Sequence, residues 1–326
     1  MSLEVTESQE AYRALCEREP SIPLFSQAWW LDAVAGPAHW SAVLALRGEE
    51  VAGALPYVRK RRWGMTLLAQ PKLTQTLGPW VRPSQAKYAK ALGVEKDVLG
   101  ALADGLPTFA AYRQNWDAAR TNWLPFYWRG FEQTTRYTYR LALSGNEEAV
   151  WQGLQENIRR EVRKARGRYS VTIRPADALE EFLELNRRTF QRQGKTPPYS
   201  DELVRALHDA ATSREACDVL VAEDPEGNLH AGAFIVRDAT TAYYLMGGGD
   251  PEHRNSGAGS LCLWKAIRRQ PAHVKTFDFE GSMVEPIERF FRAFGAVQTP
   301  YFRVQRKDSR ILRLAECGRN LLRKSR

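Results

Sequence analysis

Apolar residues recur along this chain with two different periods. A period of two, or a short apolar run between turn residues, is typical of β-strands and marks several segments of each half. The predicted strands are 40–48, 50–61, 65–70, 75–81, 108–116 and the aromatic segment ending at 144 in the first half, and 170–175, 217–223, 230–237, 241–247, 275–281 and 299–307 in the second.

Helical spacing, with apolar residues three or four positions apart, marks the remaining segments. The predicted helices are the N-terminal segment to residue 18, 25–34 with Ser26 as its N-cap, 84–104, 147–169, 176–192, 201–214, 257–269, 286–295 and a closing basic segment after 307. Helices and hairpin-linked strands therefore mix in both halves, which predicts an α/β (α+β) layered architecture repeated in outline. We expect two domains, 1–143 and 144–326, each a mixed central sheet flanked by helices.

Length and composition agree with two folded domains. The chain has 326 residues, of which 44% are hydrophobic and 26% charged, a balance that excludes wholesale disorder. No apolar run reaches the ~18 residues of a membrane span, and no signal peptide is recognisable. The four cysteines show no metal-ligand spacing, so we expect reduced thiols, no metal and a cytoplasmic protein. The formal net charge of +9 favours contact with polyanions, or serves solubility alone.

A glycine-rich turn separates the apolar strand at 241–247 from the helix at 257–269. Its spacing is R-x-x-G-x-G, and such a turn before a helix exposes backbone N–H groups that can bind a pyrophosphate. Glycine lets phosphates approach the backbone because it has no Cβ; a simple connector is the alternative. The predicted donor-binding residues of the turn are Arg254, Asn255, Ser256, Gly257, Ala258, Gly259 and Ser260.

Two carboxylates follow in the strand-like segment 275–281. Asp278 and Glu280 would project from one face of a strand, with Phe277 and Phe279 on the other. Their mutual repulsion would raise the pKa of one of them, and together they could deprotonate an amine. Alternatively, Asp278 pairs with an arginine and Glu280 caps the following turn or helix.

Basic residues cluster in two places. The predicted helix at 147–169 carries Arg159, Arg163 and Lys164, which suit a phosphate-rich acceptor, tRNA or an anionic lipid head group, or simply a solvated helix face. A tighter cluster, Arg59–Arg62, precedes Trp63 at a predicted hairpin turn. This cluster is interpreted as a membrane-surface contact, an acceptor contact or only a charged turn.

The turn at 254–259, the DFEGS segment at 278–282 with its downstream IERFFRAFGA and PYFRV, and the basic run NIRREVRKARGRYSV resemble the FemAB-like branch of the GNAT acyltransferase superfamily. The resemblance implies two tandem GNAT-like domains that transfer an acyl or aminoacyl group to an amine. It implies a carbonyl-polarising backbone group near Leu245 and Gly247, and a basic residue near the reacting centre at Arg303. Tyr244 is a candidate for protonating the leaving thiol.

The resemblance leaves the donor open. The full R-x-x-G-x-G and the short chain favour acyl-CoA, such as acetyl-CoA, over aminoacyl-tRNA. The leading hypothesis is an N-acyltransferase acting on an amine of a cell-envelope or polysaccharide or peptide precursor, with peripheral membrane contact as one interpretation of its charge. The alternatives are an aminoacyl-tRNA-dependent peptidyltransferase, with tRNA as partner, and a non-catalytic RNA-binding or scaffold protein on the same fold.

Overall fold

A computed structural model describes residues 3–177, 179–281 and 283–309. The chain forms two compact units, one of Met1–Arg136 with Pro300–Arg326 and one of Tyr137–Thr299. The sequence placed the boundary at 143/144 and assigned the C-terminal strand to the second domain. In the structure the division falls seven residues earlier, and the chain returns to the first unit at Pro300, because β13 (Val297–Lys307) pairs with β6 (Ala111–Asn115).

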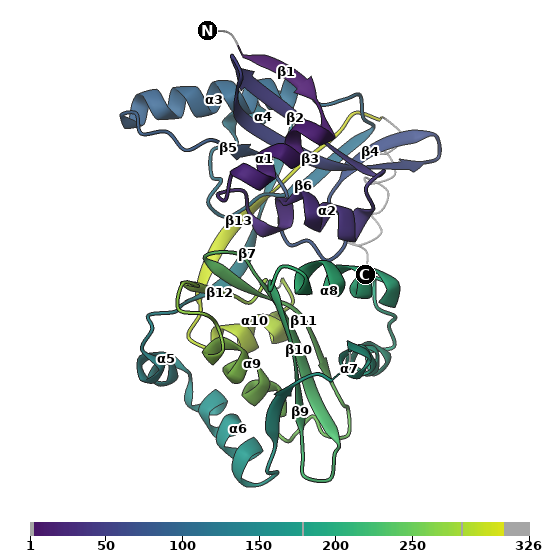
Figure 1. Ribbon diagram of the computed structural model, residues 1–326, viewed down its shortest axis with the longest axis vertical. Coiled ribbons are helices and arrows are strands. Elements are labelled where there is room, and N and C mark those ends of the chain that lie inside the picture. The colour runs from purple at the N-terminus through teal and green to yellow at the C-terminus, as the bar shows by residue number, and fades with distance from the viewer. Residues whose placement is uncertain (1–2, 178, 282, 310–326) are drawn as a thin grey trace, which may run out of the picture. The chain divides into compact units, whose positions relative to one another are not determined.

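The first unit is built on a mixed sheet (Figure 1). Its strands run in the order β1-β2-β3-β4-β6-β13, with β5 paired to β3, and among the described strands of this unit only β4 and β6 are parallel. The remaining strands of this unit are β1 (Glu4–Glu7), β2 (Trp40–Arg47), β3 (Glu50–Arg62), β4 (Met65–Ala69) and β5 (Trp80–Val81). Its helices are α1 (Gln9–Arg18), the 3-10 helix η1 (Leu24–Ser26), α2 (Ala28–Ala35), α3 (Tyr88–Asp104) and α4 (Leu124–Tyr127).

Alternation along β2 explains the layers of the first unit. Val43 and Ala45 pack in one buried cluster with α3 and α4, whereas Ala42 and Leu44 pack in another with α1 and α2. Because successive side chains of a strand point to opposite faces, this sheet is buried on both sides.

The second unit has the sheet order β7-β12-β11-β10-β9-β8, and over its described residues only β11 and β12 are parallel. The strands are β7 (Glu132–Ala142), β8 (Thr172–Pro175), β9 (Cys217–Glu223), β10 (Leu229–Arg237), β11 (Thr241–Gly249) and β12 (Thr276–Asp278). The helices are α5 (Glu147–Gly153), α6 (Glu156–Gly167), α7 (Leu179–Gln191), α8 (Asp201–Thr212), α9 (Ala258–Arg268) and α10 (Glu285–Arg292).

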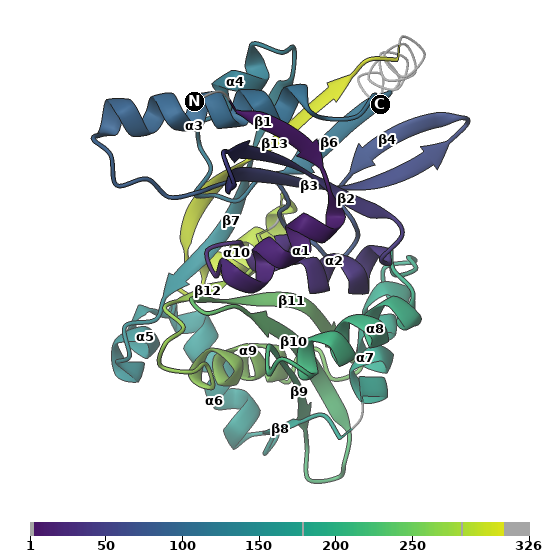
Figure 2. The same ribbon diagram turned by 45° about the horizontal axis from the view of Figure 1, so that its top comes forward.

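Helices cover both faces of this second sheet as well (Figures 1 and 2). Ala233 and Ile235 of β10 pack in the cluster that includes α6, α9 and the segment around α10. On the opposite face, the ring of Phe234 makes an edge contact with Phe182 of α7 and another with His208 of α8. The α/β fold class predicted from the sequence is confirmed, with a mixed sheet and flanking helices in each unit.

Several predicted elements differ in their bounds. Ser26 lies in η1 and is buried, so the N-cap of α2 is Gln27 rather than Ser26. The helix expected at 147–169 is two helices, because the backbone is extended at Leu154 and Gln155. The closing basic helix lies outside the described residues. Among the described helices, none combines the length and the apolar character that crossing a bilayer demands.

Candidate active site

The turn between β11 and α9 has a left-handed residue at its centre. Gly257 is the N-cap of α9 with φ +82° and is buried. A Cβ at this position would overlap the backbone oxygen of Glu161 on α6. Glycine is therefore required here for backbone conformation and for close packing against α6. The sequence predicted that glycine at 257 lets a phosphate approach the backbone. This reason is wrong, because the Cβ position of Gly257 faces the Glu161 backbone and not an open site.

Gly259 occupies the opposite environment. It is exposed, and a Cβ there would meet no atom within 4 Å. The first N–H groups of a helix lack helical acceptors; that of Ala258 donates to the hydroxyl of Ser256 (3.2 Å), and in the described chain we find no acceptor for that of Gly259. Arg254 and Asn255, also exposed, precede this open helix start. An anion therefore finds open backbone at Gly259, with a guanidinium nearby in the sequence.

The strand before the turn contains a β-bulge. Phe234 of β10 pairs with Met246 and Ile235 pairs with Tyr244, so Leu245 is the extra residue of β11. A bulged residue is left out of the ladder. The backbone at Leu245, which sequence reasoning put near the carbonyl-polarising group, is thus irregular.

Beyond the bulge, alternate residues of β11 face away from β10. Asp250 donates its N–H to the His230 carbonyl, whereas both backbone groups of Gly249 bond the Thr189 hydroxyl, at 2.8 and 3.2 Å. In an antiparallel ladder the N–H and C=O of one residue point to the same side, and the side alternates. Gly247 therefore directs its N–H to the same edge as Gly249, away from β10.

Helix α7 holds this glycine segment from one face. The Asn186 side chain donates to the Gly247 carbonyl (2.7 Å) and accepts from the Tyr199 hydroxyl (3.1 Å). A Cβ at Gly248 would lie 2.7 Å from the Asn186 nitrogen of the α7 backbone. Gly248 thus permits the close approach of α7, and Asn186 fixes the peptide group at Gly247.

Tyr244 lies on the other face of the strand. A Cβ at Gly247 would overlap its hydroxyl oxygen, so the hydroxyl sits directly beside Gly247. The ring makes an edge contact with Phe291 (6.0 Å between centroids). Burial, followed by the nearby Cys262 and Tyr199, raises the pKa of Tyr244 well above its usual value, so the phenol is protonated at neutral pH.

Strands β11 and β12 separate at the level of this site. Their parallel pairing ends at Tyr243 and Asp278, and the chain after β12 stays with β7, since Phe279 donates its N–H to the Tyr139 carbonyl (2.9 Å). The strand-like segment predicted to continue to Gly281 is therefore shorter. Phe277 and Phe279 lie in one buried cluster, on a common side as the sequence predicted, although the strand itself ends at Asp278.

Asp278 is fully buried, and its carboxylate has three hydrogen-bonding partners. It pairs with Arg140 (2.8 Å), accepts a hydrogen bond from the Thr138 hydroxyl, and accepts the backbone N–H of Glu280 (2.8 Å). This is the arginine-paired alternative raised from the sequence. A carboxylate with all three of these partners orders the chain after β12 and is poorly placed to accept a proton from a substrate.

Glu280 differs from Asp278 in each of these respects. Its backbone is left-handed, with φ +58°, and Gly281 follows at φ +56° against the Tyr137 backbone. Its Oε1 atom is shielded from solvent and bonds no described residue. Burial first, and then the charge of Asp278, raise the pKa of Glu280 well above its usual value. The sequence predicted that mutual repulsion would raise the pKa of one carboxyl; the pKa of Glu280 is raised, and burial is the larger cause.

The other predicted site residues have different surroundings. Arg303 belongs to the first unit and donates to the Asn115 side chain (2.9 Å); its role near a reacting centre stays a prediction. On α6, Arg159 and Arg163 pair with Glu156 at 2.9 Å, and Lys164 pairs with Glu161 at 2.5 Å. The charge of the polyanion surface predicted from those three cations is therefore partly offset within its own helix, because Glu156 and Glu161 supply two carboxylates to three cations.

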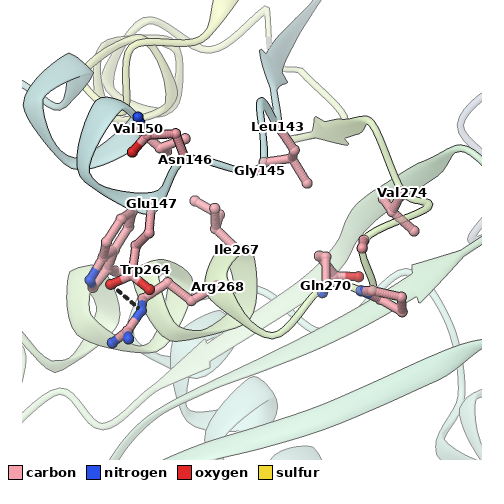
Figure 3. Close-up of a pocket in the computed structure, with 12 residues that line it drawn as sticks. Leu143, Gly145, Asn146, Glu147, Val150, Trp264, Ile267, Arg268, Gln270 and Val274 are labelled. Carbon is pink, nitrogen blue, oxygen red and sulfur yellow. Dashed lines mark ion pairs between the residues drawn. The ribbon is translucent and has the colours of Figure 1, made fainter.

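A cavity of about 260 Å³ lies elsewhere in the second unit (Figure 3). It is bounded by the start of α5, the last turns of α9 and the segment 270–274. Glu147, the carboxylate in its wall, pairs with Arg268 at 2.7 Å. This cavity is at the end of α9 opposite the glycine-rich turn, so we assign it no part in the chemistry.

Sequence reasoning missed Asn186, Thr189 and Tyr199. A signal existed for the first two: Phe182, Asn186 and Thr189 share one stripe of α7, so two polar residues interrupt an otherwise apolar face. A polar side chain on a buried helix face requires a partner. Nothing local indicated that the partner is β11.

Comparison with known proteins agrees with this fold. Residues 153–313 match the model of the acetyltransferase (GNAT) domain family. No curated protein sequence matches the chain at a significant level.

Solved structures share the fold over nearly the whole chain. The crystal structure of FemX is 15% identical with a TM-score of 0.68, covering 93% of this chain and 97% of that one. A tandem GNAT protein from the clavulanic acid biosynthesis pathway is 12% identical with a TM-score of 0.54, covering 94% and 99%. A conserved protein of unknown function from Bacteroides thetaiotaomicron is 11% identical with a TM-score of 0.55, covering 90% and 97%. At these identities the likeness concerns the fold.

Proposed function

Because the chain carries a GNAT acetyltransferase domain, and is thereby an acyltransferase of that fold, we propose that it transfers an acyl group from acyl-CoA to an amine. One observation carries the proposal. Past the Tyr243–Asp278 pair, β11 and β12 separate, and each then presents a polar group that the sheet leaves unused. These are the N–H of Gly247 on one strand and the carboxyl of Glu280 after the other.

The donor binds at the start of α9 in this proposal. The pyrophosphate of acyl-CoA takes the open helix start at Gly259, where a Cβ position is free of protein atoms. Arg254 and Asn255, both exposed, supply side-chain donors. Gly257 contributes indirectly by allowing α9 to pack on α6.

Transfer then needs a polarised carbonyl, a neutral amine and a proton for the thiolate. The Gly247 N–H, oriented by Asn186 through the carbonyl of the same residue, stabilises the oxyanion that forms on the thioester carbonyl. Glu280 accepts the amine proton as the new C–N bond forms. The C–S bond breaks, and Tyr244 protonates the departing sulfur. The raised pKa of Glu280 is closer to the pKa of an amine than that of an ordinary carboxyl is, and a smaller difference in pKa favours proton transfer.

We propose an amine of a cell-envelope, polysaccharide or peptide precursor as the acceptor class. Its support is the resemblance of the sequence to the FemAB-like branch, together with the fold shared with FemX. An aminoacyl-tRNA donor has no comparable support, because the α6 cations predicted to bind tRNA are paired with Glu156 and Glu161. The non-catalytic scaffold is disfavoured by the match to an acetyltransferase family.

Calorimetric titration with acetyl-CoA tests the donor half. Wild-type protein should bind, and Gly259→Val should lose most of the affinity while keeping its melting temperature, since the new side chain enters open space. Arg160→Gln is the matched control, because this exposed cation lies on α6 and has no ion pair in the described chain. Absence of wild-type binding, or equal binding by the Gly259 variant, would refute the CoA assignment.

A further inference from the structure

The hairpin of β3 and β4 extends away from the other elements of the first unit (Figures 1 and 2). Its last rungs pair Arg61 with Thr66 and Arg62 with Met65. The parallel pairing of β4 with β6 begins only at Leu67, so none of the described strands neighbours the tip on that side. All side chains from residue 59 to 64 are exposed.

Trp63 sits at the apex of this hairpin in an unusual state. It is 74% exposed, the most exposed tryptophan among the large apolar residues described. Its φ is +51°, and Gly64 follows at +72°, which makes a two-residue turn. Such turns favour Asn, Asp or Gly at the first position, and a bulky side chain there is disfavoured. Neither packing nor local preference therefore explains an indole at the apex.

The charge around the tip is of one sign. Residues 51–94 contain no Asp or Glu, and eight Lys or Arg. Lys60, Arg61 and Arg62 form no ion pair with any described residue, and neither do Lys72 or Arg113. Partial burial first, and then the charges of Lys72 and Arg113, lower the pKa of Lys60, so these three cations lie near one another. By contrast, Arg59 pairs with Glu7 at the base.

We propose that the tip of this hairpin, Lys60–Trp63, docks on an anionic lipid bilayer. Tryptophan is favoured at the boundary between water and lipid, and basic residues beside it are attracted to anionic head groups. Arg62 already lies over the indole, 4.2 Å from the ring centroid, so the cation and the ring are presented together. A nucleic acid would satisfy the charge too, but single strands are bound along grooves with successive stacking platforms, whereas this is one ring on a projecting turn.

Vesicle co-sedimentation in the absence of acyl-CoA tests the proposal independently of the proposed reaction. Wild-type protein should bind vesicles of equal phosphatidylglycerol and phosphatidylcholine, bind pure phosphatidylcholine weakly, and dissociate as salt is raised. Each basic residue at an anionic surface adds about 1 kcal/mol, or about fivefold in affinity. The triple variant K60Q/R61Q/R62Q should therefore bind about a hundredfold more weakly.

Two controls separate the hairpin from net charge and from exposed aromatics. Arg160→Gln with Arg166→Gln removes two exposed cations from α6, and Trp128→Ala removes another exposed indole of the first unit; both should bind like wild type. Trp63→Ala should weaken binding about tenfold, and brominated lipid should quench less fluorescence in Trp63→Phe. The proposal would be overturned if the hairpin variants bound vesicles as well as wild type does. It would also be overturned if wild type bound an RNA oligomer through the hairpin and did not bind vesicles.

Discussion

Two turns of the second unit follow neighbouring parallel strands, and they use the same backbone conformation for opposite purposes. After β11, left-handed Gly257 starts α9 and leaves open backbone at exposed Gly259. After β12, Glu280 and Gly281 are both left-handed, and the Glu280 carboxyl is directed inward. Its Oε1 atom is shielded from water and bonds no hydrogen-bond donor of the described chain. One turn is suited to holding an anion and the other to exchanging a proton. The difference lies in solvent access rather than in backbone shape.

The largest effect should come from Glu280→Gln, which keeps shape and removes the titratable group. We expect acyl transfer, measured as CoA release from acetyl-CoA with a panel of amines, to fall about a thousandfold, the usual scale for a general base. Affinity for acetyl-CoA should be unchanged, since the donor turn is separate. A rate within threefold of wild type would remove Glu280 from the mechanism.

The same substitution has a signature in stability. A carboxyl whose folded pKa is raised stabilises the fold most below its unfolded pKa, and this contribution is lost as pH rises through the folded pKa. The free energy of unfolding of wild type, measured with urea, should therefore fall relative to Glu280→Gln as pH increases above about 4.5. A parallel pH dependence of the two proteins would contradict the buried carboxyl.

Gly257→Ala should damage folding rather than binding. Its Cβ would overlap the Glu161 backbone in a left-handed conformation, and overpacking together with backbone strain costs about 3 kcal/mol or more. Gly259→Ala is the matched control; in open space on a helix it should unfold at the same denaturant concentration or later. Equal stability of the two variants would show that the two glycines are not distinguished by packing.

Asp278→Asn should cost about 2–3 kcal/mol of stability. Removing one partner of a buried ion pair leaves an uncompensated charge, and the value is reduced here because Arg140 is partly exposed. The reduction in rate should be smaller than that of Glu280→Gln once the protein is folded, because Asp278 positions the chain. Denaturant unfolding and the rate of CoA release, measured on the same preparation of Asp278→Asn, test this expectation. If the variant keeps its stability but loses as much rate as Glu280→Gln, Asp278 is the base instead.

Asn186→Ala should have a smaller effect on the rate than Glu280→Gln. It removes the bond to the Gly247 carbonyl, so the Gly247 peptide loses its fixed orientation. A loss of about tenfold in kcat with little change in KM for acetyl-CoA is expected from a loosened oxyanion donor. A change in KM alone would place Asn186 in donor binding, and Tyr199→Phe, which loses only the outer bond, should fall between wild type and Asn186→Ala.

The sequence predicted the local features of this comparison and missed the long-range ones. Apolar periodicity located β10, β11 and α9, and the glycine spacing located the turn, because these signals lie within a few residues. The pattern of residues 275–281 did not predict the left-handed backbone of Glu280, because Phe277 and Phe279 alternate with acidic residues as in a strand. The partners of Asp278 and Gly247, namely Arg140 and Asn186, lie 138 and 61 residues away, and no local pattern pairs them.

The central claim is that Glu280 takes the proton from the amine in acyl transfer. Its most direct test is kcat/KM for CoA release as a function of pH, in wild type and Glu280→Gln. A base acts when ionised, so the wild-type rate should rise with pH through a raised carboxyl pKa, while the variant keeps a low rate without that step. The same pH-dependent step in both proteins, at comparable rates, would contradict the account.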